Sequence, residues 1–187
     1  ILNIYKPIGC TSFDVVKIVR SILKDKKVGH AGTLDPFAEG VLVLGTGPDT
    51  KQLTTISGSD KVYEATLILG TKTDTLDLEG SVIEKKEIPQ LATEKVDAVL
   101  KSFVGEQLQT PPMYSAKKVN GQRLYKLARK NVEVEREPRA INIFEIKLNE
   151  YNSPLLSFRV KCSKGTYIRV LGSDIAEKFG TVGHLIA

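Results

Sequence analysis

Asp35 is the side chain of this sequence that is best placed to carry out a reaction. It follows a turn that contains Gly29 and Gly32, and it precedes the apolar run 40–44. Loops held between regular elements commonly carry functional groups, and a carboxylate there can act as a nucleophile or stabilise a cationic sugar. Asp35-Pro36 is also a good structural turn, because aspartate bonds its own backbone and proline restricts φ. For an isolated Asp-Pro the structural interpretation is the more common one, and the residues alone leave both open.

Two other kinds of site are disfavoured by residue spacing. Glu39 lies four residues after Asp35, which on a helix would align two carboxylates as a hydrolase of the paired-carboxylate type requires. Pro36 and Gly40 instead predict a turn that leads into a strand. The two cysteines and two histidines show no metal-ligand spacing, so we expect no metal site.

The positive charge of the sequence is concentrated in residues 114–139. The whole sequence has a net charge of +5, and this segment contains eight basic residues and three glutamates, also +5, so the remainder is neutral. Such a segment suits a polyanion, because phosphate contacts release condensed counterions. A solvated helix face has the same composition, and charge alone does not separate the two interpretations. The basic residues are Lys117, Lys118, Arg123, Lys126, Arg129, Lys130, Arg136 and Arg139.

Apolar periodicity predicts the elements that must position these residues. Residues 28–39 and 71–80 are expected to be connections. The expected strands are 2–5, 40–44, 60–69, 81–84, 141–148 and 156–162, and the expected helices are 13–23, 50–56, 93–104, 123–130 and 168–179.

Two of the helices have predicted ends and apolar faces. Ser12 and Thr93 are the expected N-caps, and Gly105 is expected to end the second of these helices. The expected apolar side of the first helix consists of Phe13, Val16, Val19, Ile22 and Leu23.

The order of these elements favours an α+β fold. Strands and helices alternate without the regular βαβ rhythm of a parallel sheet, so we predict a mixed, largely antiparallel central sheet flanked by helices. The 187 residues, 41% of them apolar, are enough for one domain, or one domain with an appendage. No run approaches the roughly 18 apolar residues of a membrane span, and residues 1–6 do not form a signal peptide. We therefore expect a soluble cytoplasmic protein.

Six segments resemble a known family in the order in which they occur. They are Tyr5-Lys6-Pro7 with Gly9 and Thr11-Ser12, then 29–42 (GHAGTLDPFAEGVL), 61–65 (KVYEA), 73–77 (TDTLD), 109–116 (QTPPMYSA) and 162–169 (CSKGTYIR). The set is similar to the TruB family of tRNA pseudouridine synthases and extends over nearly the whole chain. The resemblance implies the pseudouridine synthase catalytic fold and an isomerase that converts the T-loop uridine at tRNA position 55 to pseudouridine. It implies no cofactor, because the reaction moves a glycosidic bond from N1 to C5 of uracil without redox change.

The resemblance also assigns the catalytic groups. Asp35 corresponds to the catalytic aspartate of the family, and it must be ionised whether the reaction proceeds by attack at ribose C1′ or through a glycal; the sequence does not choose between the two. An ionised carboxylate under a flipped base needs a cation, because burial alone would raise its pKa. Arg169 corresponds to that cation. Tyr63 corresponds to a tyrosine that packs on the uracil, although by its strand pattern it shares a face with Ala65 and Leu67 and is equally a core aromatic.

Further matches concern RNA binding. His30 corresponds to a histidine that fills the space left by the flipped base, and Tyr167 and Lys61 correspond to residues at the substrate. The basic segment corresponds to a flexible insertion, at about 108–137, that closes on the RNA. The phosphate-contact candidates are Lys117, Lys118, Arg123 and Arg129. The expected partner is the T stem-loop of tRNA, with no obligatory protein partner, and the protein is expected to be a monomer.

The sequence departs from the family at both ends. It begins at Ile1 without a methionine, and it ends at Ala187 inside a segment that continues in the family. We expect residues 1–187 to be a catalytic domain that is truncated at its C-terminus and lacks the PUA-like RNA-binding domain.

Two alternative functions stay open beside the tRNA enzyme. One is an RNA-guided relative that modifies ribosomal RNA within a ribonucleoprotein; the length and composition of residues 109–139 favour the tRNA form instead. The other is a non-catalytic RNA-folding module. The presence of Asp35, Tyr63 and Arg169 argues against that module, because only the reaction needs the carboxylate.

Overall fold

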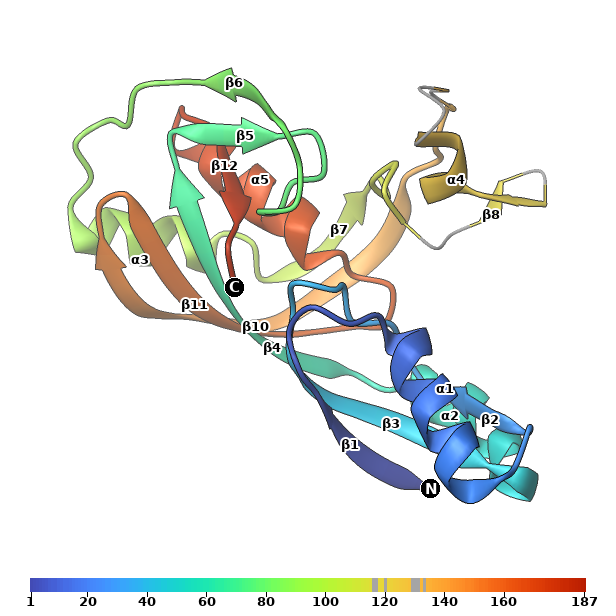
Figure 1. Ribbon diagram of the computed structural model, residues 1–187. Coiled ribbons are helices and arrows are strands. Elements are labelled where there is room, and N and C mark those ends of the chain that lie inside the picture. Colours follow the sequence, from blue (N-terminus) through green and yellow to red (C-terminus); the bar gives the residue numbers. More distant parts are fainter. Residues whose placement is uncertain (116–117, 120, 129–131, 133) are drawn as a thin grey trace. The chain divides into compact units, whose positions relative to one another are not determined.

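The computed structural model (Figure 1) describes residues 1–115, 118–119, 121–128, 132 and 134–187. The chain forms two compact units, Ile1–Ser59 and Asp60–Ala187. Each unit contains an antiparallel sheet with helices packed against it, which confirms the predicted α+β class. In the part of the chain that is described, no helix is long and apolar enough to cross a lipid bilayer.

The first unit is built on a three-stranded antiparallel sheet. The strand order is β1 (Leu2–Lys6), β3 (Gly40–Thr46) and β2 (Val28–His30). Strand β2 occupies the start of a segment that we expected to be a connection. It forms because Val28 is buried against the sheet and pairs with Thr46.

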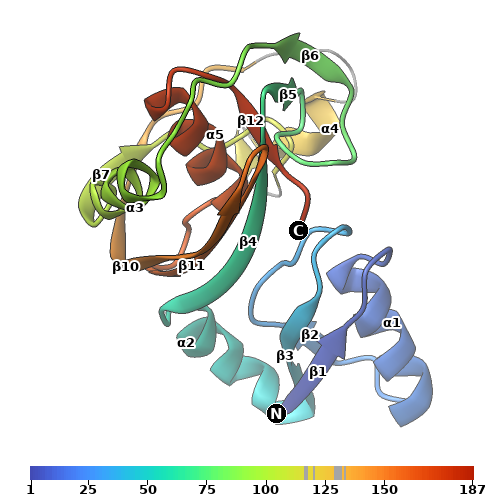
Figure 2. The same cartoon turned by 90° about the vertical axis from the view of Figure 1, so that its left-hand side faces the viewer.

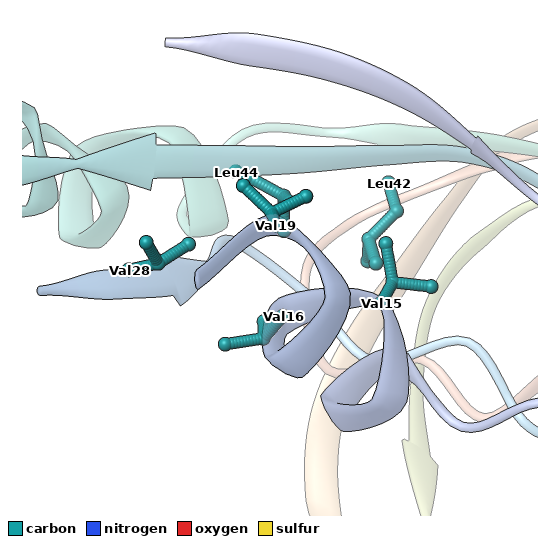
Figure 3. Close-up of a cluster of buried hydrophobic side chains, with 6 residues drawn as sticks. All are labelled: Val15, Val16, Val19, Val28, Leu42 and Leu44. Carbon is teal, nitrogen blue, oxygen red and sulfur yellow. The ribbon is translucent and has the colours of Figure 1, made fainter. Parts of the chain in front are cut away.

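Helix α1 (Ser12–Leu23) packs on one face of this sheet, as Figure 3 shows. After β3 the chain forms a 3₁₀ helix, η1 (Gly47–Gln52), and the short helix α2 (Leu53–Ser57), where a single helix was predicted. The buried cluster between α1 and the sheet consists of Val15, Val16, Val19, Val28, Leu42 and Leu44.

The start of α1 corrects the predicted N-cap. Thr11 is the cap: its hydroxyl accepts the Asp14 N–H at 3.1 Å, and the Asp14 carboxylate accepts the Thr11 N–H at 3.1 Å. This reciprocal pair is a capping box. Since Thr11 already has the extended backbone of a cap, Ser12 becomes the first helical residue and its hydroxyl bonds elsewhere.

The apolar face of α1 is narrower than predicted. The helix buries Val15, Val16 and Val19. The expected face was wrong for three residues, because a sheet of three short strands covers only one stripe of the helix. The exposed residues are Phe13, Ile22 and Leu23.

The second unit is built on a five-stranded sheet in which every neighbouring pair is antiparallel. The strand order is β12 (Gly183–Leu185), β4 (Lys61–Leu69), β11 (Leu155–Cys162), β10 (Arg139–Asn152) and β7 (Gly105–Gln109). Strands β7 and β12 were not predicted. Both are short and pair at the two edges of the sheet, so their own residues show little periodicity.

Helices α3 (Thr93–Lys101) and α5 (Ile168–Lys178) contact this sheet and each other (Figure 2). The predicted Thr93 cap is wrong: Ala92 occupies the N-cap position without a side-chain hydrogen bond, and Thr93 is already helical. The helix also ends at Lys101, before Gly105, because Gly105 begins β7. The fully buried side chains of this layer include Val96, Leu100, Phe158, Leu171 and Ile175.

Two small hairpins complete the second unit. Strand β5 (Thr71–Thr73) lies inside the expected connection 71–80, and it pairs with β6 (Val82–Lys85), where a strand was predicted at 81–84. Strand β8 (Lys118–Val119) pairs with β9 (Gln122–Arg123), and helix α4 (Leu124–Ala128) follows directly.

Candidate active site

The loop that carries Asp35 joins β2 to β3 in the first unit. Ala31 and Phe37 are buried, and the Ala31 N–H donates to the Val43 carbonyl at 2.9 Å. Asp35 begins a turn in which the Ala38 N–H donates to the Asp35 carbonyl at 3.1 Å. The loop is therefore packed on the core on both sides of a partly exposed aspartate.

Both neighbours of Asp35 are hydrogen bonded through their backbones. The Ser12 hydroxyl accepts the Leu34 N–H at 2.9 Å and donates to the Leu34 carbonyl at 3.1 Å. On the other side, the Pro36 carbonyl accepts the Gly9 N–H at 2.8 Å. The carboxylate is thus carried by a backbone that α1 and the β1–α1 corner hold in place.

Lys6, at the end of β1, is a fully buried lysine. Its Nζ donates to the carbonyls of Pro7 at 2.9 Å, Cys10 at 2.8 Å and Pro36 at 3.4 Å. An ammonium group has three donors, and a buried charge is tolerated only when its hydrogen bonds are made. Lys6 therefore joins the corner between β1 and α1 to the Asp35 loop.

His30 and Glu39 lie at the two ends of this loop. His30 is half-buried, and its Nδ1 donates to the Gly32 carbonyl. The Glu39 carboxylate accepts the Tyr5 hydroxyl at 2.5 Å, a hydrogen bond that raises the pKa of Tyr5. Glu39 precedes a strand and is held by Tyr5, so it does not share a helix with Asp35 as a paired-carboxylate hydrolase would need.

Arg169, in the first turn of α5, is a buried cation of the second unit. Its Nη1 donates to the Thr75 carbonyl at 2.8 Å and lies 3.3 Å from Asp77 Oδ2, and its Nη2 donates to the Tyr114 carbonyl at 2.7 Å. The Arg169 and Asp77 side chains are only 7% and 5% exposed. A guanidinium can satisfy three such partners at once because its donors lie in a rigid plane, so Arg169 is held in one orientation.

Asp77 is the residue of this arrangement to which sequence reasoning assigned no role. Its Oδ1 accepts the Thr75 hydroxyl at 2.5 Å and the Glu79 N–H at 3.0 Å, while Oδ2 faces Arg169. The motif 73–77 contained this residue, and an aspartate two positions after Thr75 in an expected connection was the available signal. The ion pair itself depends on two segments that are distant along the chain.

Gln109 holds the backbone at the start of α5. Its Oε1 accepts the Tyr167 N–H at 2.8 Å, and its Nε2 donates to the Tyr167 carbonyl at 3.2 Å. Gln109 is buried, and Tyr167 occupies the N-cap position of α5. The segment 109–114 therefore contacts α5 twice, through Gln109 and through the Tyr114 carbonyl that Arg169 bonds.

Tyr63 and Lys61 lie near the start of β4. Tyr63 is on the same face as Ala65 and Leu67, but it is only partly buried whereas those two residues are buried. It pairs across the sheet with Val160, and Lys61 pairs with Cys162. Tyr63 is thus at the margin of the core.

The basic segment is only partly described. Lys117 and Arg129 lie outside the described residues. Lys118 and Arg123 pair with each other in the β8–β9 hairpin.

In the described ranges, no group of three or more His, Cys, Asp or Glu side chains converges as a metal site would require.

The family model and the curated relatives that this chain resembles both describe pseudouridine synthases. Residues 20–168 match the model of the family described as TruB family pseudouridylate synthase (N terminal domain). The chain is 51% identical over 180 residues to tRNA pseudouridine synthase B of Clostridium tetani, covering 96% of this chain and 62% of the relative. It is 49% identical over 180 residues to tRNA pseudouridine synthase B of Geobacter sulfurreducens, covering 96% of this chain and 59% of the relative. The chain therefore spans about 60% of the length of these relatives.

Solved structures with the same fold come from larger chains. The crystal structure of a Cbf5-Nop10-Gar1 complex contains a chain with a TM-score of 0.75 and 29% identity, covering 98% of this chain and 45% of that one. The structure of an H/ACA RNP bound to a substrate RNA containing 2′-deoxyuridine gives a TM-score of 0.71 and 26% identity, with coverage of 98% and 44%.

Proposed function

Because the chain belongs to the TruB family of pseudouridylate synthases, we propose that it isomerises the T-loop uridine at position 55 of tRNA to pseudouridine. The observation that carries the proposal is Asp35, a carboxylate in a loop whose backbone is hydrogen bonded on both sides. The N-glycosidic bond is broken, the uracil turns, and a bond from C5 to C1′ of the ribose is formed, after which C5 loses its proton and N1 is protonated, so that no atom is gained or lost overall. Asp35 supplies the negative charge, by adding to the nucleotide at C1′ or by assisting elimination to a glycal.

In this proposal Arg169 is the cation that keeps Asp35 ionised at the flipped base. Arg169 has the properties that such a cation needs, since it is buried, permanently charged and oriented by Asp77 and two carbonyls. An opposite charge lowers the pKa of a carboxylate and so offsets the effect of burial. Its contribution is electrostatic, and it does not exchange protons with the substrate.

The proposed substrate contacts use the remaining candidates. Tyr63 packs on the uracil, which contributes on the order of 1–3 kcal/mol for a stacked base. His30 fills the space that the flipped nucleotide leaves in the RNA loop, and Tyr167 and Lys61 contact the nucleotide and its backbone. The insertion at about 108–137 supplies phosphate contacts, with Lys117, Lys118, Arg123 and Arg129 as the candidates.

The proposed enzyme needs no cofactor and acts as a monomer on the T stem-loop of tRNA in the cytoplasm. A second candidate, an RNA-guided synthase within a ribonucleoprotein, is favoured by the likeness to the chain in the H/ACA RNP bound to a substrate RNA. The higher identity to tRNA pseudouridine synthase B supports the tRNA enzyme. Modification of a free T stem-loop, without guide RNA or added protein, would exclude the guided form.

The test compares wild type with Asp35→Asn and Glu39→Gln on a T stem-loop transcript, with pseudouridine mapped chemically. We expect product with wild type and with Glu39→Gln, and none with Asp35→Asn. Glu39→Gln is the matched control, because it neutralises another carboxylate of the same loop. No product with wild type, or undiminished product with Asp35→Asn, would overturn the proposal.

A further inference from the structure

The hydroxyl of Ser12 has a role that helix capping does not explain. Ser12 is 2% exposed, and it is the first residue of α1 rather than its cap. Burying a hydroxyl is unfavourable unless its hydrogen bonds are made. Both bonds of Ser12 go to one residue, Leu34, whose N–H it accepts and whose carbonyl it donates to.

The bond to the Leu34 carbonyl fixes the peptide plane that joins Leu34 to Asp35. The next peptide plane, between Asp35 and Pro36, is fixed by the Ala38 N–H, which donates to the Asp35 carbonyl. A peptide unit is planar, so these two planes together define the direction in which the Asp35 side chain leaves the backbone. The plane before Asp35 is held by the Ser12 side chain, and the plane after it is held by the backbone N–H of Ala38.

Lys6 and Gly9 act one peptide further away. They bond the Pro36 carbonyl, which belongs to the plane after Pro36. Lys6 also makes its two shorter bonds, of 2.9 and 2.8 Å, to the carbonyls of Pro7 and Cys10. Its main effect is therefore on the corner between β1 and α1, whereas both contacts of Ser12 are at Leu34.

We propose that Ser12 is a positioning residue for the reaction, which acts through Leu34 to orient the carboxylate of Asp35. The proposal rests on the function proposed above, in which Asp35 is the reacting group. A reacting group must be held near its productive geometry, and a misplacement of about 1 Å can cost on the order of a hundredfold in rate. Loss of this hydroxyl leaves α1 capped by Thr11, so the helix and its buried stripe are retained.

The test measures the rate constant of pseudouridine formation with full-length protein in excess over a T stem-loop, together with RNA affinity and melting temperature. The variants are Ser12→Ala, Ser12→Thr, which keeps a hydroxyl, and Thr181→Val. Thr181 is the matched control, because it is 1% exposed and its hydroxyl donates to the Lys86 carbonyl at 3.3 Å in the second unit.

For Ser12→Ala we expect a rate constant lower by about 10- to 100-fold, with unchanged RNA affinity and a fall in melting temperature no greater than that of Thr181→Val. Ser12→Thr should restore most of the rate, and Thr181→Val should keep the wild-type rate. A Ser12→Ala rate within about twofold of wild type would overturn the proposal, as would an equal loss of rate in Thr181→Val.

Hydrogen exchange of the Leu34 and Asp35 amides separates this inference from the proposed function. Ser12→Ala should expose these amides to faster exchange while the α1 amides stay protected. Unchanged exchange at Leu34 and Asp35 would overturn the positioning role even if the wild type is active. Absence of pseudouridine with wild type would instead overturn the proposed function.

Discussion

The loop around Asp35 and the first turn of α5 are held through different parts of their residues. Around Asp35 the hydrogen bonds act on the backbone of Leu34 and Pro36. At Arg169 they act on the side chain itself, whose guanidinium contacts Thr75, Tyr114 and Asp77.

This difference agrees with the two proposed roles. A nucleophile must change its bonding during the reaction, and hydrogen bonds to the neighbouring peptides can position it without taking part in that change. A cation that acts by charge alone can be fixed through its own donors, and fixed charges need no reorganisation when the transition state forms. We expect substitutions in the loop to separate rate from stability, and substitutions around Arg169 to change both.

The largest effect in this comparison is expected for Asp77→Asn. Removing one partner of a buried ion pair leaves an uncompensated charge, and we expect a loss in the free energy of unfolding on the order of 3 kcal/mol. The rate of pseudouridine formation should fall by about a hundredfold, because Arg169 loses part of its orientation. Chemical denaturation and single-turnover kinetics measure the two effects.

Asp74→Asn is the matched control for Asp77→Asn. Asp74 lies in the same connection, accepts the Ser81 N–H at 2.8 Å and is exposed. We expect it to change stability and rate much less. If Asp77→Asn lowered the rate without lowering the free energy of unfolding, substitutions around Arg169 would separate rate from stability just as those in the Asp35 loop are expected to. The contrast between the two regions would then be wrong.

A smaller effect, on stability alone, is expected for Lys6→Met. The variant keeps most of the side-chain volume but leaves the carbonyls of Pro7 and Cys10 without the donor that Lys6 supplies. Leaving a buried acceptor without its donor costs about 1–3 kcal/mol. Since these two bonds are only part-buried, we expect the variant to lose about 2 kcal/mol in total, and the midpoint of urea unfolding should fall. The rate at saturating protein should stay close to that of wild type, because the Ser12 contact to Leu34 remains. A large loss of rate at unchanged stability would show that the Pro36 side of the loop also orients Asp35.

The smallest effect is expected at Asp174, a carboxylate of α5 that lies near Glu177 on the same helix. Burial, followed by the charge of Glu177, raises the pKa of Asp174 from 3.8 to about 6, and Lys72 partly opposes the shift. The folded state therefore binds this proton more tightly than the unfolded state. Stability is retained below about pH 4 and falls as the pH rises to about 6, where the folded carboxyl ionises.

We expect Asp174→Asn to raise the free energy of unfolding on the order of 1 kcal/mol at pH 8 and to leave it unchanged at pH 4, since the residue is partly exposed and screening reduces the effect. Denaturation at the two pH values measures the difference. Glu177→Gln removes both the repulsion of Asp174 and the ion pair with Lys72 at 3.0 Å, so its gain at pH 8 should be smaller than that of Asp174→Asn. An equal gain at both pH values would show that ionisation of Asp174 is not its cause.

Local patterns in the sequence were sufficient for most of the fold. The helices at α1, α3 and α5 and the strands β3, β4, β10 and β11 were predicted because each is long enough to show its own periodicity. The strands β7 and β12 were missed, since short edge strands form through their neighbours. The Asp35 loop was located from its glycines and proline, and its family resemblance identified the carboxylate.

The contacts that orient the candidate residues were decided only by the tertiary structure. Thr11 and Ser12 are adjacent hydroxyl residues, either of which suits an N-cap, and only the loop at Leu34 determines that Ser12 faces inward. The pairing of Arg169 with Asp77 likewise depends on tertiary structure, because it joins α5 to a connection that is distant along the chain. A helix cap or an apolar stripe depends on residues within a few positions, whereas these hydrogen bonds join segments that meet only when the sheet and its helices have packed.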